Sequence, residues 1–149
     1  MDPQNLNKEN EINFDILPST KEEEEIVINK IVSFNNLQEK FINNNLIFNN
    51  YIIKDCDEII AGINSVITYW NILFISILFV DENHRGKNLG SLLLRKVEDE
   101  AKSLGVTLVH LDTFDFQAKD FYLKHGYEIF GILDDCPKDH KRYYLKKSL

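Results

Sequence analysis

The stretch Val80-Asp81-Glu82-Asn83-His84-Arg85-Gly86-Lys87-Asn88-Leu89-Gly90-Ser91 decides how this chain folds. An almost wholly apolar run, 72–80, enters it and an amphipathic run, 92–104, leaves it, which predicts a strand, a loop and a helix. A glycine-bearing loop that opens a helix can direct several backbone N–H groups at one point, beside the positive end of the helix dipole. The stretch therefore predicts a seat for a phosphate or pyrophosphate. The alternative is an ordinary basic turn between a strand and a helix.

A second motif lies further along the chain, Ala118-Lys119-Asp120-Phe121-Tyr122-Leu123-Lys124-His125-Gly126-Tyr127. It joins an aromatic pair to a helix that ends at Gly126 and to a following strand. The two motifs resemble those of the GCN5-related N-acetyltransferases (GNATs), which read Gln/Arg-x-x-Gly-x-Gly/Ala in the acetyl-CoA loop and Ala-x-x-Phe-Tyr-x-x-x-Gly-Phe/Tyr in the helix. The middle glycine of the loop is Asn88 here, and asparagine is well able to adopt a positive φ.

The resemblance implies that the loop and the strand before it bind acetyl-CoA as a co-substrate. In the family, the end of this strand splays from its neighbour, and the amide-bearing pantetheine arm adds to the free backbone groups like a short extra strand. The side chains of Arg85 and Lys87 would also pair with phosphate groups. The residues that the resemblance assigns to the cofactor are Leu78, Phe79, Val80, Arg85, Gly86, Lys87, Asn88, Leu89, Gly90 and Ser91.

The resemblance also implies a catalytic role for Tyr122. In the family the matching tyrosine lies near the sulfur of CoA, where its phenol can donate a proton to the departing thiolate. The alternative is an aromatic residue of the core. Where family members often carry a cofactor-contacting asparagine, this chain has Asp115, and an anion cannot donate the amide hydrogen bond.

The base that takes the proton of the amine is predicted on the strand after the helix. Some family members carry Glu or Asp in the strand before the loop, but this chain has Ser76 there. His110 and Asp112 alternate onto one face of the following strand. Asp112 is the better candidate, because ligands gather at the carboxyl ends of strands in open α/β sheets. The alternative for His110 is a hydrogen-bonded, half-buried histidine of the sheet.

The whole pattern predicts an α/β fold with a mixed, largely antiparallel central sheet and helices on both faces, as in GNAT acyltransferases. Residues 1–11 are expected to form a flexible tail. Residues 12–149 are expected to form a single GNAT-like domain. Expected strands cover 12–17, 47–54, 59–69, 72–80, 106–112, 127–133 and 140–147. The first expected helix follows Ser19, which has capping-box spacing with Glu22, and is broken at Asn35-Asn36. Further helices are expected over 37–42, 92–104 and 116–125. The polar turn 55–57 makes its two flanking strands a hairpin.

Composition and charge narrow the function classes. The 149 residues are 44% hydrophobic, which suits one globular domain. No apolar run approaches the roughly 20 residues of a membrane span, and the N-terminus lacks the layout of a signal peptide. We therefore expect a cytoplasmic protein with no membrane partner. The net charge of -7 disfavours nucleic acid as a partner and mildly favours a cationic small substrate.

The cysteines and histidines predict no metal site. Cys56 and Cys136 have no CxxC spacing, so they are expected to be free thiols. The four histidines form no recognisable set of metal ligands. The composition, rich in Asn and Ile, points to an AT-rich bacterial genome.

The sequence thus predicts an enzyme, an N-acetyltransferase that moves an acetyl group from acetyl-CoA to a primary amine. Direct attack by the amine, with Tyr122 as general acid, is the expected mechanism, and a small cationic molecule is the expected acceptor. Three alternatives stay open: a non-catalytic acyl-CoA-binding sensor, motivated by Ser76; an acetyltransferase of protein N-termini or lysines; and a plain α/β interaction domain. A homodimer is also left open.

Overall fold

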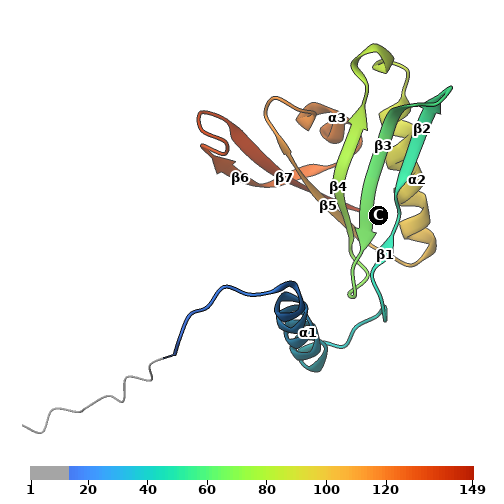
Figure 1. Cartoon of the computed structure of the whole chain (residues 1–149). Helices are drawn as coiled ribbons and strands as arrows, with labels where there is room; N and C mark the ends of the chain where they lie inside the picture. Colours follow the sequence, from blue (N-terminus) through green and yellow to red (C-terminus); the bar gives the residue numbers. More distant parts are fainter. Residues whose placement is uncertain (1–13) are drawn as a thin grey trace, which may run out of the picture. The chain divides into compact units, whose positions relative to one another are not determined.

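The computed structural model describes residues 14–149, which form two compact units. The first unit ends at Lys40, and the second spans Phe41–Leu149. The first contains helix α1 (Lys21–Gln38; Figure 1). This helix begins with a capping box, in which the Thr20 hydroxyl accepts the N–H of Glu23 and the Glu23 carboxylate accepts the N–H of Thr20. The predicted capping box, Ser19 with Glu22, was therefore one residue too early.

Three expectations for this region need correction or fall outside the described residues. Residues 14–20 are in neither strand nor helix, so the strand expected at 12–17 is wrong for 14–17. The expected tail, 1–11, and the first two residues of that strand lie outside the described residues. The helix does not break at Asn35, and no helix covers 41–46, so a separate helix at 37–42 is wrong. Asparagine costs a helix only a few tenths of a kcal/mol, far less than proline.

The second unit is built on a seven-stranded sheet. Its order is β1-β3-β4-β5-β7-β6, and β2 also pairs with β3. Only β4 and β5 pair in parallel, and every other pair is antiparallel, so the prediction of a mixed, largely antiparallel sheet is confirmed. The strands are β1 (Ile47–Phe48), β2 (Tyr51–Asp55), β3 (Glu58–Ile67), β4 (Leu73–Val80), β5 (Leu108–Phe114), β6 (Glu128–Asp134) and β7 (Lys141–Ser148).

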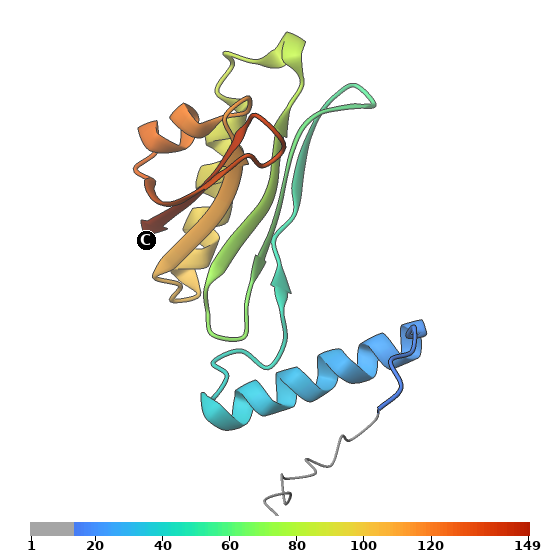
Figure 2. The same cartoon turned by 90° about the vertical axis from the view of Figure 1, so that its left-hand side faces the viewer.

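Two helices and a single 3-10 turn complete this unit. These are η1 (Glu82–His84), α2 (Leu89–Ser103) and α3 (Lys119–Lys124). α2 lies against β3 and β4, as Figures 1 and 2 show from two directions. α2 ends before Gly105 and α3 before Gly126, and both glycines have positive φ angles, 77° and 84°. α3 starts later than the expected 116, because residues 115–118 form a turn instead.

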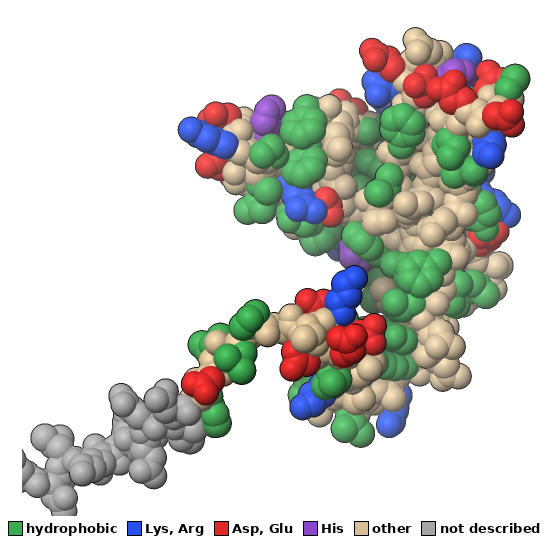
Figure 3. Space-filling model, in the orientation of Figure 1, with side chains coloured by type: hydrophobic (Ala, Val, Ile, Leu, Met, Phe, Trp, Pro, Cys, Tyr) green, Lys and Arg blue, Asp and Glu red, His purple; other side chains and the backbone are tan. Residues whose placement is uncertain are grey.

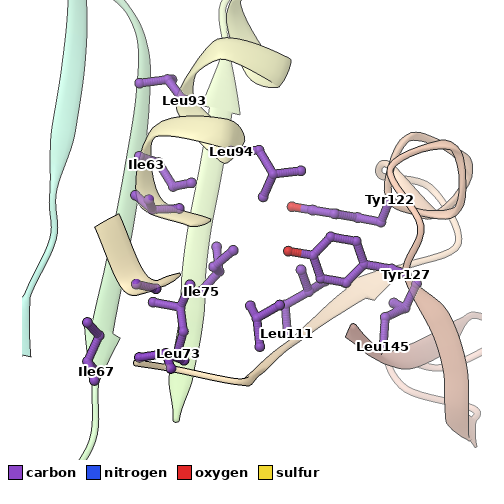
Figure 4. Close-up of a cluster of buried hydrophobic side chains, with 14 of the residues drawn as sticks. Ile63, Ile67, Leu73, Ile75, Leu93, Leu94, Leu111, Tyr122, Tyr127 and Leu145 are labelled. Carbon is purple, nitrogen blue, oxygen red and sulfur yellow. The ribbon is translucent and has the colours of Figure 1, made fainter. Parts of the chain in front are cut away.

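The core lies between these helices and one face of the sheet (Figure 4). α2 contributes Leu93, Leu94, Val97 and Ala101, and all four have at most 4% of their surface exposed. Tyr122 of α3 and Leu111 of β5 belong to the same cluster. α2 and α3 therefore cover the same face, and the expectation of helices on the second face stays a prediction. Burial of apolar surface here stabilises the fold by roughly 25 cal/mol for each Å² removed from water.

The central feature for function is a fork between β4 and β5. The two strands pair only from Leu73 and Val109 to Ile75 and Leu111. Beyond that point β4 continues to Val80 and β5 to Phe114 without pairing, and Figure 1 shows the two strands diverging. A β-bulge in the pairing of β4 with β3 falls at Ser76, where the fork begins. Bulges bend a strand and increase its twist, which accounts for the divergence. The splay implied by the family resemblance is thus present.

Candidate active site

A cleft of about 640 Å³ lies in the fork between β4 and β5. Figure 3 shows the hollow, between the part of the surface formed by β6 and β7 and the part formed by β2, β3 and β4. Its walls come from β4, from the loop that opens α2, from the end of β5 and from the segment leading into α3. The lining residues are 75–80, 84–86, 88–91, 112–113, 116–118 and 121–122.

The loop that opens α2 presents a run of free backbone donors to this cleft. Asn88 has φ 61° and ψ 14°, the left-handed conformation that asparagine tolerates. Gly86 also has a positive φ, 77°. Among the described residues, no backbone N–H from Gly86 to Ser91 donates a hydrogen bond, and the N-cap has no side-chain bond. These N–H groups lie at the positive end of the α2 dipole and suit an anion.

Gly90 keeps the start of α2 close to α3. A Cβ atom at this position would lie 3.4 Å from Cζ of Phe121 and 3.6 Å from Cγ2 of Val80. Any larger side chain would therefore have to displace an aromatic ring or the end of β4. The second glycine of the loop motif thus has a packing reason that the sequence pattern alone did not show.

The forked end of β4 supplies a second row of backbone groups. Residues 77–80 pair with β3 on one side but have no partner strand on the β5 side. Leu78 and Val80 are half-buried in the cleft wall, where they stand opposite the fully buried Ile63 and Ala61 of β3. The free edge suits an extended, amide-bearing ligand.

Tyr122 places its phenol at the inner wall of the cleft. The side chain is 6% exposed and packs edge-on against Phe121 and Tyr127, at ring-centroid distances of 5.2 and 5.6 Å. Figure 4 shows its hydroxyl pointing toward Leu94 of α2, and it donates to no described residue. Burial, with a smaller contribution from the charge of Asp112, raises the pKa of this phenol to about 12. Tyr122 therefore keeps its proton at neutral pH.

Asp112 also lines the cleft, just beyond the last β4–β5 pair. Its Oδ2 accepts hydrogen bonds of 2.7 Å from Nε and from a terminal nitrogen of Arg142. This bond to Asp112 raises the pKa of the Arg142 guanidinium above its usual range. The guanidinium also lies over the rings of Phe114 and Tyr144, 5.4 and 5.6 Å from their centroids. The carboxylate is thus held in place by a partner that the sequence did not reveal.

His110 shares the outward face of β5 with Asp112 but does not line the cleft. It packs on the ring of Phe74 at 4.9 Å, and burial lowers the pKa of its imidazole below the usual value. Between the two base candidates, the structure brings only Asp112 to the cleft. Asp115 lies outside the cleft as well. Its carboxylate accepts hydrogen bonds from His140 and from the N–H of Lys141. Ser76 bonds the backbone oxygen of Asn64 at 3.1 Å.

Nine of the ten residues assigned to the cofactor line the cleft, and the exception is Lys87. Sequence reasoning missed two others of note. His84 lines the cleft with Nδ1 3.0 Å from Asp81 and Nε2 3.6 Å from Asp55. Phe116, 58% exposed, stands at the cleft wall and stacks on Phe114 at 5.2 Å. His84 stands directly before Arg85 in the loop motif, so its place in the sequence could have indicated a residue of the cleft. No feature of the sequence indicated that Phe116 lines the cleft.

The described residues contain neither a group of metal ligands nor a membrane-spanning helix. No group of three or more His, Cys, Asp or Glu side chains in residues 14–149 is arranged to hold a metal ion. Within the same residues, no helix has the length and apolar character to cross a membrane. Cys56 and Cys136 are both free thiols, as expected.

Comparison with known proteins agrees with this geometry. The model of the acetyltransferase (GNAT) family matches residues 13–127. The chain belongs to the GNAT acetyltransferase family. A crystal structure of an acetyltransferase from Bacillus cereus ATCC 14579 is similar over 91% of this chain and 98% of that one, with 33% identity and a TM-score of 0.81. The fork, the loop and the α3 tyrosine are therefore parts of a GNAT fold.

Two further relatives carry a substrate in their names. The chain is 35% identical to the blasticidin-S acetyltransferase of Streptomyces morookaense over 81 residues, which are 54% of this chain and 60% of that protein. A structure described as a streptothricin acetyltransferase from Bacillus anthracis, solved with acetyl coenzyme A, shares the fold. It has a TM-score of 0.61 and 23% identity, over 74% of this chain and 66% of that one.

Proposed function

We propose that this GNAT protein is an acetyl-CoA-dependent N-acetyltransferase that acts on a primary amine of a small cationic molecule. One observation carries the proposal. The protonated phenol of Tyr122 opens into the same cleft as the free N–H groups of the α2 loop and the free edge of β4. Family membership and the acetyl coenzyme A complex of the fold relative support the choice of cofactor.

The cleft offers two features that fit acetyl-CoA. The N–H groups from Gly86 to Ser91, at the start of α2, would hold the pyrophosphate, and the Arg85 side chain would add a positive charge. The unpaired edge of β4 from Leu78 to Val80 would accept and donate hydrogen bonds to the amides of the pantetheine arm. Bound in this way, acetyl-CoA supplies a thioester as the acetyl donor.

Tyr122 would act as the general acid. The amine nitrogen forms a bond to the acetyl carbon, the carbon–sulfur bond breaks, and the phenolic proton of Tyr122 goes to the departing sulfur. The nitrogen in turn loses one proton, which returns through water to the Tyr122 phenolate, so the products are an acetamide and a thiol and the phenol is restored. The high pKa of Tyr122 keeps the acid protonated at neutral pH, and the neighbouring wall of apolar core residues excludes water from it.

Asp112 would receive the acceptor. Its Oδ2 is engaged by Arg142, and no described residue bonds its other oxygen. That oxygen can attract an ammonium group and take its proton, directly or through water. A cationic acceptor is further favoured by the net charge of -7 and by the name of the blasticidin-S acetyltransferase.

A direct assay tests the proposal. Purified protein is mixed with acetyl-CoA and a panel of blasticidin S, streptothricin, aminoglycosides, polyamines and a lysine peptide, and thiol release and acetylated product are measured. We expect N-acetylation of at least one small cationic amine and none of the peptide. A Gly90→Glu variant, which places bulk and charge where the loop meets Phe121, should release no thiol above background. Binding of acetyl-CoA without any product would favour the non-catalytic sensor instead.

A further inference from the structure

His125, the residue that ends α3, makes two hydrogen bonds that join α3 to the start of α2. Its Nδ1 lies 2.7 Å from the backbone oxygen of Phe121, and its Nε2 lies 2.9 Å from Oγ of Ser91. A carbonyl oxygen only accepts, so Nδ1 carries the proton of this bond. In the neutral ring Nε2 is then an acceptor, and the Ser91 hydroxyl donates to it. The imidazole thus bridges the backbone of one helix and a side chain of the other.

The ring of Phe121 strengthens the same connection. It packs on the His125 ring at 4.3 Å and meets Tyr122 edge-on at 5.2 Å. The other end of the Phe121 ring faces Gly90, where a Cβ would lie 3.4 Å away. The contact therefore runs without a gap from the loop that opens α2, through Phe121 and His125, to the turn of helix that carries Tyr122.

α3 needs such an external tether. It contains only six residues, its N-cap is Ala118, and no side chain caps its first turn. Isolated helices of this length do not hold their shape in water, so tertiary contacts must fix them. The bond from His125 to Ser91 is the one side-chain hydrogen bond between the described residues of α3 or its C-cap and α2.

We propose that His125 is a positioning residue that sets Tyr122 relative to the phosphate-binding loop. The inference rests on the proposed function, because it takes Tyr122 as the acid and the loop as the cofactor seat. His125 is not among the residues that line the cleft. It acts through Ser91, which lines the cleft, and through the last turn of α3, so that the cofactor is held at a fixed distance from its proton donor.

Three variants separate this role from general stability. His125→Asn keeps a donor near the place of Nδ1 but is too short to reach Ser91, His125→Gln can reach Ser91 through its longer amide, and Ser91→Ala removes the partner while keeping the backbone N–H. We expect His125→Asn and Ser91→Ala each to lower kcat about 10-fold with the KM for acetyl-CoA nearly unchanged. The double variant should be no worse than either single one, and His125→Gln should recover part of the loss.

The decisive comparison is made in a Tyr122→Phe background, with thermal unfolding measured for every variant. If His125 acts by positioning the phenol, His125→Asn should lower kcat no further once the phenol is gone. An equal 10-fold loss in both backgrounds, or a fall in melting temperature with kcat intact, would overturn the inference and leave a structural contact. If Tyr122→Phe itself has normal kcat, the proposed acid fails and the inference fails with it. If only the His125 variants are normal, the inference alone fails.

Discussion

Two buried tyrosines of the same core differ in the hydrogen bonds of their hydroxyl groups. Tyr122 lies on the side of the core that lines the cleft, called the open side here, and Tyr127 lies beside Glu98 and Lys147, called the closed side. Tyr122 is 6% exposed and Tyr127 is 4% exposed, and their rings meet at 5.6 Å. Tyr127 donates a 2.7 Å hydrogen bond to the buried carboxylate of Glu98 on α2. The Tyr122 hydroxyl donates to no described residue, and Tyr122 lines the cleft.

The surroundings of Tyr127 form a closed polar network. Glu98, 5% exposed, accepts the Tyr127 hydroxyl on one oxygen and the Lys147 ammonium on the other, at 2.7 Å each. The Lys147 nitrogen also lies 5.4 Å from the centre of the Tyr127 ring. Burial and the Glu98 carboxylate together raise the pKa of Tyr127 far above its usual value. Buried polar groups that satisfy one another in this way fix α2 against the C-terminal strands.

The comparison teaches that burial alone does not separate a structural tyrosine from a functional one. The difference lies in whether the hydroxyl has a protein partner. A buried polar group without one is costly unless a ligand or water completes its bonds. The pair therefore predicts opposite responses to the same chemical change, loss of the hydroxyl.

The largest effect is expected from Tyr122→Phe. Removal of the proposed general acid should lower kcat about 100-fold, because proton donation to the leaving group contributes that order of rate enhancement. The affinity for acetyl-CoA, measured by calorimetry, and the melting temperature should stay close to wild type, because no described residue bonds this hydroxyl. Weaker cofactor binding at unchanged turnover would show that Tyr122 belongs to the binding wall alone.

The mirror experiment, Tyr127→Phe, should affect stability and leave chemistry intact. The change strips one hydrogen bond from the buried Glu98 carboxylate, and we expect the free energy of unfolding to fall by about 2 kcal/mol. Urea denaturation gives this value, and kcat measured well below the melting temperature should equal that of wild type. A large fall in kcat at full folding would erase the distinction between the two tyrosines.

A smaller effect, close to none, is expected from pH on the acid itself. The pKa of Tyr122 is raised to about 12, so the phenol stays protonated and kcat should show no descending limb from this group between pH 8 and 10. The free energy of unfolding should fall at high pH for the same reason, because the folded pKa lies above the unfolded one. The contribution of Tyr122 is complete below the unfolded pKa of 10 and is lost as the pH rises from there through about 12. A descending limb near pH 9 that Tyr122→Phe abolishes would contradict this environment.

Much of the open side could be predicted from sequence, because its signals are local. The loop motif showed that Asn88 is able to adopt a positive φ and placed the start of α2 within a few residues. The Phe-Tyr pair placed Tyr122 on a helix that a glycine ends. The sheet could also be anticipated, since apolar runs and turn residues alternate along residues 47–148. Errors fell where local signals compete, as at the capping box, where Ser19 and Thr20 both have suitable acceptors.

The closed side could not be predicted, because its partners meet only in the folded chain. Glu98 reads as a charged position on a solvated helix face, yet it is buried between Tyr127 and Lys147, which come from other elements. The Arg142 partner of Asp112 and the link from His125 to Ser91 are likewise long-range contacts. Pairing of this kind depends on sheet order and register, which one sequence does not specify.

The central claim, that the α2 loop seats the phosphates of acetyl-CoA beside Tyr122, is tested most directly by calorimetric titration with acetyl-CoA. The informative variant is Asn88→Asp, since aspartate also tolerates the left-handed conformation and changes little but the charge. Ser103→Glu, at the other end of α2, adds the same charge far from the loop and serves as the matched control. We predict that Asn88→Asp weakens binding by about 10-fold or more through repulsion of the phosphates, while Ser103→Glu binds like wild type. Equal affinity in all three proteins, or no binding in any, would contradict the account.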